Sequence, residues 1–221
     1  MLKFAASHET RKLLLTSSGA VYGSQPASIS HLREDFAGAP NPLEPSSAYS
    51  EGKRVAELMC AVYGADSGIE CKIARCFAFT GPHLPLNAHF AIGNFIRDAI
   101  RGDVIMVNGD GTPKRSYMYA ADLAIWLWSI LFRAPSLDAF NVGSDQSISI
   151  LELAQKVVSS LRSTATVKVG QMPIAGEPMK QYVPSIEKAQ QQLGLKLRVS
   201  LEEAIRRTAA WHGYATPTQQ A

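Results

Sequence analysis

Few cysteines occur in the sequence, and their spacing argues against two kinds of small protein. Cys60, Cys71 and Cys76 are odd in number and form no Cys-x-x-Cys pair, which disfavours a disulfide framework and a structural zinc site. The histidines show no ligand spacing either, so we expect no metal. Cysteine usage of this kind fits a reducing compartment, and we therefore expect a cytoplasmic protein.

Long apolar runs and clusters of like charge are also missing. The longest apolar stretch, residues 123–132, is too short to span a bilayer, and no charged-then-apolar leader follows Met1. The formal net charge is only +3 and the basic residues are scattered, which gives nucleic-acid binding little support. With 221 residues and 46% hydrophobic composition, the chain can form one large or two small domains. We expect neither a membrane nor a nucleic-acid partner.

Short apolar segments alternate with helical patterns along the chain, which predicts an α/β fold with a parallel sheet. The expected strands cover residues 12–18, 71–79, 104–107, 139–143 and 166–169. The expected helices cover residues 90–101, 120–133, 150–162, 185–193 and 201–213. Two of these helices follow capping-box sequences, Ser149 with Glu152 and Ser200 with Glu203. The tail of the chain is expected to form a smaller α/β lobe.

One further helix is expected after a long loop. It starts near Ser46 or Ser47, either of which can cap it, and Gly64 or Gly68 ends it. Apolar residues recur in this helix at helical spacing, and they are Val55, Leu58, Met59 and Val62. Such a stripe predicts one buried face.

Three reactive groups lie at the two ends of that long loop. The expected strand 12–18 ends in a serine pair, and the expected helix begins with Tyr49-x-x-x-Lys53. Tyr at i and Lys at i+4 lie on one helix face, so a phenol and an ammonium can act on the same substrate atom. Such a pair alone is usually an ordinary surface pair, but the serine-rich strand end favours catalysis. A serine hydrolase is a poorer alternative, because no Gly-x-Ser-x-Gly sequence is present.

These residues open a series of motifs that runs through nearly the whole chain. The series comprises Thr16 to Gly23, Tyr49-x-x-x-Lys53, Gly81-Pro82, Asn108 to Thr112 with Arg115 and Asp122, Phe140 to Gly143, and the tail from Leu193 to Trp211. In this order the series resembles the NAD-dependent epimerase/dehydratase family, the sugar-nucleotide branch of the extended short-chain dehydrogenases.

The resemblance implies a fold with two functional parts. Residues 1–83 and about 115–145 would form the C-terminal part of a Rossmann-type parallel sheet, the part that holds NAD(P) in this family. Residues about 84–114 and 146–221 would form the smaller α/β substrate-binding lobe, which holds a nucleoside-diphosphate sugar.

The resemblance also implies roles for the serine pair and the helix start. Tyr49 would remove a proton from a sugar hydroxyl while hydride passes to the nicotinamide. Lys53 would favour the tyrosinate form and hold the nicotinamide ribose, and Ser18 would hydrogen-bond the reacting oxygen. Ser17 would join Tyr49 and Lys53 at the cofactor. The alternative for each residue is an ordinary structural or surface position.

On the substrate side, the resemblance implies that Arg115 clasps the diphosphate, because a planar guanidinium suits two oxygens at once. An exposed arginine after a turn is the alternative. Further candidates for the sugar pocket or its border are Asn94, His89, Arg75 and Tyr22. A structural role is the alternative for each of them. Asp122 matches a family Asp that opens the next helix, where we expect a capping role.

Several positions depart from the family pattern. The family's 4,6-dehydratases carry an Asp-Glu pair where this chain has Gly19 and Ala20, neither of which can act as an acid or a base. Dehydration of that type is therefore disfavoured against epimerisation, or ketone reduction and its reverse. Ala78 replaces a substrate-binding Asn, and Ile174 replaces an Arg of the late loop, so the grip on the diphosphate must differ.

The largest departure is a missing glycine turn. The family's Gly-x-x-Gly-x-x-Gly sequence, which approaches the cofactor pyrophosphate, does not occur, and the first glycine is Gly19. We therefore expect a truncated form that lacks about four strand–helix units and leaves strand 13–17 without its inner neighbours. One hypothesis is an enzyme part, completed by a longer form, by a second copy or by a chain that supplies the missing half. The other is a non-catalytic remnant or scaffold with at most weak nucleotide-sugar binding.

Overall fold

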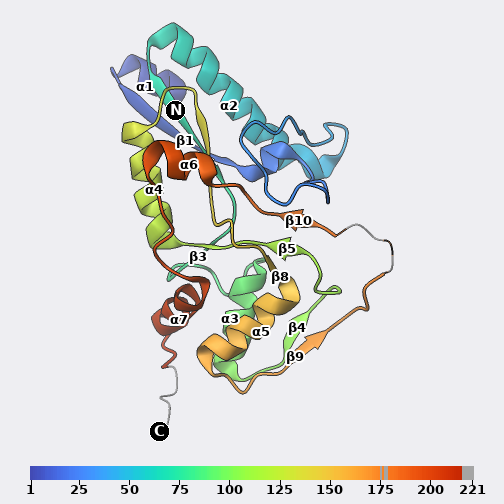
Figure 1. Ribbon diagram of the computed structural model, residues 1–221. Coiled ribbons are helices and arrows are strands. Elements are labelled where there is room, and N and C mark those ends of the chain that lie inside the picture. The colour runs from blue at the N-terminus through green and yellow to red at the C-terminus, as the bar shows by residue number, and fades with distance from the viewer. Residues whose placement is uncertain (175, 177–178, 216–221) are drawn as a thin grey trace. The chain divides into compact units, whose positions relative to one another are not determined.

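A computed structural model describes residues 1–174, 176 and 179–215, and these residues divide into two units (Figure 1). Unit 1 comprises Met1–Phe77, Leu123–Asp145 and Tyr182–Lys196. Unit 2 comprises Ala78–Asp122, Gln146–Gln181 and the residues from Leu197 onwards. These bounds place residues 182–196 with unit 1, whereas the motif series had grouped them with the smaller lobe. Which unit binds cofactor and which binds sugar stays a prediction.

Unit 1 is built on a parallel sheet in the order β1-β2-β7. Its strands are β1 (Lys12–Ser18), β2 (Glu70–Cys76) and β7 (Ala139–Val142). The register pairs Ser18 with Cys76 and Cys76 with Val142, so the carboxyl ends of all three strands lie at one edge. The predicted α/β fold with a parallel sheet is confirmed. Among the described residues, β1 pairs with β2 alone and is an edge strand.

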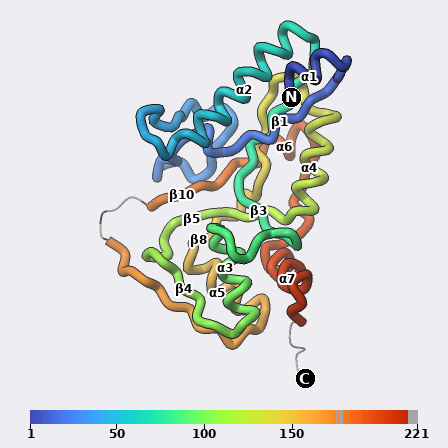
Figure 2. Tube along the Cα trace, turned by 180° about the vertical axis from the view of Figure 1, so that it is seen from behind, coloured from blue at the N-terminus to red at the C-terminus, as the bar shows by residue number. Residues whose placement is uncertain are grey.

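Helices cover the sheet of unit 1. They are α1 (Leu2–Ser7), α2 (Ala48–Ser67), α4 (Ala120–Arg133) and α6 (Glu187–Leu193), with the 3-10 turns η1 (Gly19–Tyr22) and η2 (Pro45–Ser47). In both views β1 passes between α2 and α4 (Figures 1 and 2). Ala5 of α1 and Cys60 of α2 pack with Ile69 and Cys71 in one buried cluster, so both helices lie on the same face of the sheet.

The predicted buried stripe of α2 is wrong. Val55, Leu58, Met59 and Val62 are 55%, 62%, 37% and 45% exposed, respectively. Within α2, all of which the structure describes, Cys60 is the one buried residue. The helix approaches the sheet with small and polar residues instead, since the stripe's apolar residues lie on another face.

The ends of α2 show one correct and one incorrect expectation. Ser47 precedes the helix, but its side chain makes no capping bond, because η2 already holds Ser47 in helical conformation (φ −80°, ψ −7°). The expected cap at Ser46 or Ser47 is therefore wrong. Gly68 ends the helix in the left-handed conformation at φ 71°, as one of the two alternatives predicted.

Unit 2 packs three helices around one core. These are α3 (Ala91–Arg101), α5 (Ile150–Leu161) and α7 (Leu201–Trp211). Its short strands are β3 (Phe79–Thr80), β4 (Ile105–Val107), β5 (Lys114–Arg115), β6 (Met118–Tyr119), β8 (Ile148–Ser149) and β9 (Val167–Val169), and β10 (Gln181–Tyr182) lies where the chain passes to unit 1. The core includes Ile96, Leu153, Val157, Leu161 and Ile205, all fully buried.

The helix starts of unit 2 follow the sequence closely. Ser149 and Glu152 form a complete capping box at α5, as predicted. At α7 the Ser200 side chain accepts a hydrogen bond from the Glu203 amide at 3.3 Å. Asp122, in contrast, caps no helix: its buried carboxylate accepts hydrogen bonds from the backbone amides of residues 198 and 199. The described part of the chain contains no helix long and apolar enough to span a membrane.

Candidate functional site

Tyr49 and Lys53 lie side by side in the first turns of α2. The Lys53 Nζ is 5.7 Å from the centroid of the Tyr49 ring, and it donates a hydrogen bond to the Thr16 carbonyl oxygen at 2.8 Å. Tyr49 is 60% exposed, so a bound molecule could reach its hydroxyl. Lys53 therefore contacts both the Tyr49 ring and the backbone near the carboxyl end of β1.

Ser18 is the last residue of β1 and is 6% exposed. Its side chain caps η1, because the Ser18 Oγ accepts a hydrogen bond from the Ala20 amide at 3.1 Å. This bond occupies a lone pair of the hydroxyl oxygen, and the hydroxyl hydrogen can still be donated to a substrate oxygen. The structure thus places Ser18 on the strand end to which Lys53 is bound.

Ser17 points to the other face of β1. Its Oγ donates a hydrogen bond to the Glu57 carboxylate of α2, and the residue is 3% exposed. The structure therefore gives Ser17 a partner within the protein, and its role at a cofactor stays a prediction. Glu57 was not singled out from the sequence, although it lies four residues after Lys53 and continues the same spacing.

Arg75 of β2 joins Glu57 in a largely buried ion pair. The Arg75 Nε donates to Glu57 Oε1 at 3.0 Å and the Nη2 donates to Oε2 at 2.8 Å, a bidentate arrangement. Burial alone would lower the pKa of Arg75, but the hydrogen bonds and charges of Glu57 and Tyr22 together outweigh it and raise that pKa. Arg75 is thus fully committed to partners within unit 1, which favours the structural alternative for this residue.

Tyr22 belongs to the same network. Its hydroxyl donates to Asn141 Oδ1 at 2.8 Å and accepts from Arg75 Nη1 at 3.0 Å. The side chain is 2% exposed, and burial raises the pKa of Tyr22 to about 12. A tyrosine held in this way is a packing residue in the described structure, and its place at the border of a sugar pocket stays a prediction.

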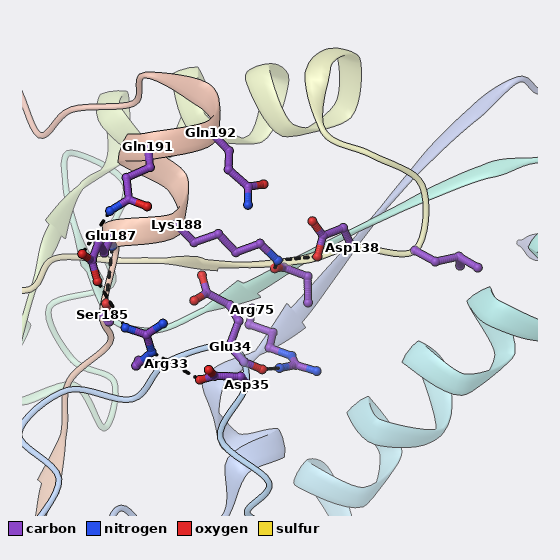
Figure 3. Close-up of a pocket in the computed structure, with 12 residues that line it drawn as sticks. Arg33, Glu34, Asp35, Arg75, Asp138, Ser185, Glu187, Lys188, Gln191 and Gln192 are labelled. Carbon is purple, nitrogen blue, oxygen red and sulfur yellow. Dashed lines mark hydrogen bonds and ion pairs between the residues drawn. The ribbon is translucent and has the colours of Figure 1, made fainter.

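A polar cavity of about 480 Å³ lies beside this network in unit 1 (Figure 3). Arg75 and Glu34 face it, and the Arg75 Nη1 donates to the Glu34 carbonyl oxygen at 3.2 Å. The other charges of the wall pair with one another, Arg33 with Glu187 at 3.3 Å and Lys188 with Asp138. Because both signs of charge are paired across the cavity, we assign no ligand to it.

In unit 2 the structure brings two predicted residues to one pocket. His89 and Asn94 both line a cavity of about 250 Å³, together with Met106, Ile150 and the turn 108–113. The Asn94 Oδ1 accepts a hydrogen bond from Arg97 Nη1 at 3.2 Å, which orients the amide. A second cavity of about 360 Å³ shares Gly109 and Pro113 with the first. The two hollows adjoin at the turn that the motif series had marked.

Arg115 does not line either of these two hollows. It lies on β5, half-buried, and its Nη1 donates to the Lys114 carbonyl oxygen at 2.8 Å. Ile174, where an arginine was expected, lines the second hollow together with Lys180. The part of the chain that the structure describes contains no group of His, Cys, Asp and Glu residues suited to a metal ion.

Comparison with known proteins bears on the whole chain. Residues 1–143 match the model of the NAD dependent epimerase/dehydratase family. UDP-glucuronic acid decarboxylase 1 of Danio rerio is 34% identical over 197 residues, which cover 89% of this chain and 46% of that protein. UDP-glucuronic acid decarboxylase 6 of Arabidopsis thaliana is 31% identical and is covered to 55%. The chain thus spans about half the length of the curated relatives it matches.

Solved structures show the same fold. UDP-glucose 4-epimerase of Thermotoga maritima, determined with UDP-glucose, aligns at a TM-score of 0.81 and 20% identity over 96% of this chain and 66% of its own. UDP-glucuronic acid 4-epimerase of Bacillus cereus, determined with UDP-glucuronic acid and NAD, aligns at 0.77 and 25% identity over 95% and 64%. The predicted Rossmann-type architecture is therefore confirmed.

Proposed function

Because the chain belongs to the NAD-dependent epimerase/dehydratase family, we propose that it acts on a nucleoside-diphosphate sugar with NAD(P), by epimerase or reductase chemistry at a sugar hydroxyl or ketone. The observation that carries this proposal is the link from Lys53 to the end of β1. This hydrogen bond holds the Lys53 ammonium beside the Tyr49 ring and on Thr16, which is two residues before Ser18 in β1.

Each of these three residues has one step to perform. Tyr49 takes the proton from the sugar hydroxyl and returns one in the reverse direction. Lys53 places a positive charge beside the phenol and supplies a donor for a ribose hydroxyl, and Ser18 donates its hydroxyl hydrogen to the reacting oxygen. A bound NAD(P) would supply the redox chemistry, which takes the hydride from the carbon that carries that hydroxyl and gives it back in the reverse direction. The exposed Tyr49 hydroxyl and the Lys53 ammonium, which is bound near the end of strand β1, are donors that fit the ribose of such a cofactor.

Dehydration is disfavoured on a second ground besides the missing carboxylates. A side chain at Gly19 would meet the Phe77 Cζ at 2.5 Å and the Tyr182 hydroxyl at 2.6 Å. This position therefore has no space for an acid or a base, and the absence of one is built into the packing of unit 1. Epimerisation and ketone reduction need only the tyrosine, the lysine and the serine.

UDP-glucuronic acid is the first substrate to test. Curated relatives are named as its decarboxylases, and the Bacillus cereus epimerase structure holds it with NAD. We propose that the nucleotide binds in the hollow of unit 2 that His89 and Asn94 line. The role of Arg115 as a diphosphate clasp remains part of this proposal.

Titration and turnover test the proposal together. NAD and UDP-glucuronic acid are titrated calorimetrically into the purified chain, and products are followed by chromatography. Tyr49→Phe removes the base, and we expect turnover to fall about 100-fold or more. Tyr63→Phe, on the same helix but fourteen residues further on, is the matched control and should leave turnover unchanged. Equal turnover in both variants would contradict the role of Tyr49 as the base.

A second candidate function is nucleotide-sugar binding without catalysis. It is favoured by the absence of a Gly-x-x-Gly-x-x-Gly sequence from the 221 residues. The same titrations separate the two. Binding of UDP-glucuronic acid with no binding of NAD at millimolar concentration would select the second candidate for this chain.

A further inference from the structure

We infer that Glu57 is a positioning residue of the proposed site, because it fixes α2 to the strand end that carries Ser18. The inference rests on the proposed function, since its subject is the placement of Tyr49 and Lys53. Glu57 touches neither substrate nor cofactor in this proposal. It acts through the helix on which the tyrosine and the lysine lie.

The spacing puts three groups on one face of α2. Tyr49, Lys53 and Glu57 follow one another at four-residue intervals, so they lie in a row along the helix. Lys53 is bound to the Thr16 carbonyl, and Glu57 accepts the hydroxyl of Ser17. Two successive turns of the helix are therefore attached to two successive residues of β1. Tyr49 extends from the end of this row.

Glu57 is also the point where the helix meets β2. The Glu57 and Arg75 side chains are 13% and 17% exposed, and their bidentate pair admits little freedom of rotation. Arg75 is held in turn by the Tyr22 hydroxyl at 3.0 Å and by the Glu34 carbonyl oxygen, as Figure 3 shows for the latter. The position of Glu57 is thus determined by both strands at once.

Apolar packing cannot do the same work in this helix. The apolar stripe around Leu58 is exposed, and Cys60 is the one buried residue among the described residues of α2. At Gly64 an added Cβ would lie 3.3 Å from the carbonyl oxygen of Ile69, in the connection to β2, so there is little space for an apolar side chain at this position. The first turns of α2 depend on polar contacts, of which the Glu57 contacts are the most buried.

Hydrogen exchange in the full chain, read by mass spectrometry of peptides, tests the attachment. Glu57→Gln keeps the shape and removes the charge, and we expect exchange in residues 16–22 and 48–57 to become about tenfold faster, with α5 unchanged. Ser17→Ala removes only the bond to β1 and should accelerate the same two segments less. This variant also decides the matter if Glu57→Gln does not fold. Glu51→Gln, which loses an exposed pair with Arg54, is the matched control.

Turnover of UDP-glucuronic acid with NAD separates positioning from a general structural role. We expect Glu57→Gln to lower kcat about tenfold with KM within twofold, because Glu57 itself touches neither substrate nor cofactor in this proposal. If the unaltered chain shows no turnover, the proposed function fails and the exchange pattern alone decides the positioning role. That role is overturned if Glu57→Gln behaves like Glu51→Gln. It is equally overturned if exchange rises as much in α4 and β7 as in residues 16–22 and 48–57.

Discussion

Helices α2 and α5 were predicted from different signals, an apolar stripe in α2 and a capping box in α5, and the structure buries their apolar residues to different extents. In α5, Leu153, Val157 and Leu161 are fully buried in the core of unit 2. In α2, Leu58 and Val62 are 62% and 45% exposed. The apolar stripe thus predicted that α2 is a helix but not which of its faces is buried, whereas the helix predicted from its capping box does bury an apolar face.

The difference between the two helices lies in what faces the protein. The inner side of α5 is apolar, and burial of that surface holds the helix in place. The inner side of α2 carries Lys53, Glu57 and Cys60, whose partners are a carbonyl oxygen, a serine hydroxyl, an arginine and a second thiol. A helix attached by directed polar contacts holds its reactive groups in one orientation, which suits the role proposed for it.

The largest test of this comparison is a pair of leucine truncations. Leu153→Ala removes fully buried surface from unit 2 and should lower the free energy of unfolding by about 2–5 kcal/mol. Leu58→Ala removes exposed surface and should change it by no more than about 0.5 kcal/mol. Urea denaturation of both variants measures the two values. Equal losses would show that the α2 stripe is covered in solution.

A smaller effect is expected from the two serines that precede these helices. Ser149→Ala breaks the capping box of α5 and should cost about 1 kcal/mol. Ser47→Ala removes a hydroxyl that makes no capping bond and should cost less than Ser149→Ala. Thermal and urea unfolding compare the variants. A larger loss for Ser47→Ala would mean that α2 starts differently from the structure described.

The smallest effect concerns pH, and its sign differs between the units. Burial raises the pKa of Glu34 in unit 1, so the stability it contributes is present below its unfolded pKa and is lost as the pH rises through the folded value. A hydrogen bond from the Ser149 amide lowers the pKa of Glu152 in unit 2, so its contribution is present at higher pH and is lost as the pH falls.

Unfolding measured from pH 4 to pH 8 checks these signs. The unaltered Glu34 makes the protein less stable as the pH rises, and Glu34→Gln should abolish that decrease. The unaltered Glu152 makes the protein more stable as the pH rises, and Glu152→Gln should abolish that increase. The two variants are matched, since each replaces a glutamate by its neutral isostere. If both substitutions changed the slope of stability against pH in the same direction, burial would not be the cause that dominates the pKa of Glu34.

Local features of this protein could be predicted from its sequence. The strand 12–18 and the helix 120–133 have the predicted bounds, and the capping box at Ser149 forms both of its bonds. Tyr49 and Lys53 are neighbours because four residues make about one helical turn. Gly68 ends α2 because its left-handed conformation suits a residue without a Cβ. Each of these features depends on residues close together in the chain.

Contacts between distant residues could not be predicted in the same way. Ser17 meets Glu57 across 40 residues, and Tyr22 meets Asn141 across 119. The same holds for Glu57 and Arg75, whose pairing turns the polar side of α2 to the sheet and leaves its apolar side exposed. The sequence by itself determined the longer helices and the strands of the unit 1 sheet, and it placed the tyrosine beside the lysine. Tertiary structure decided which face of each helix is buried, because that depends on the groups the folded chain brings opposite it.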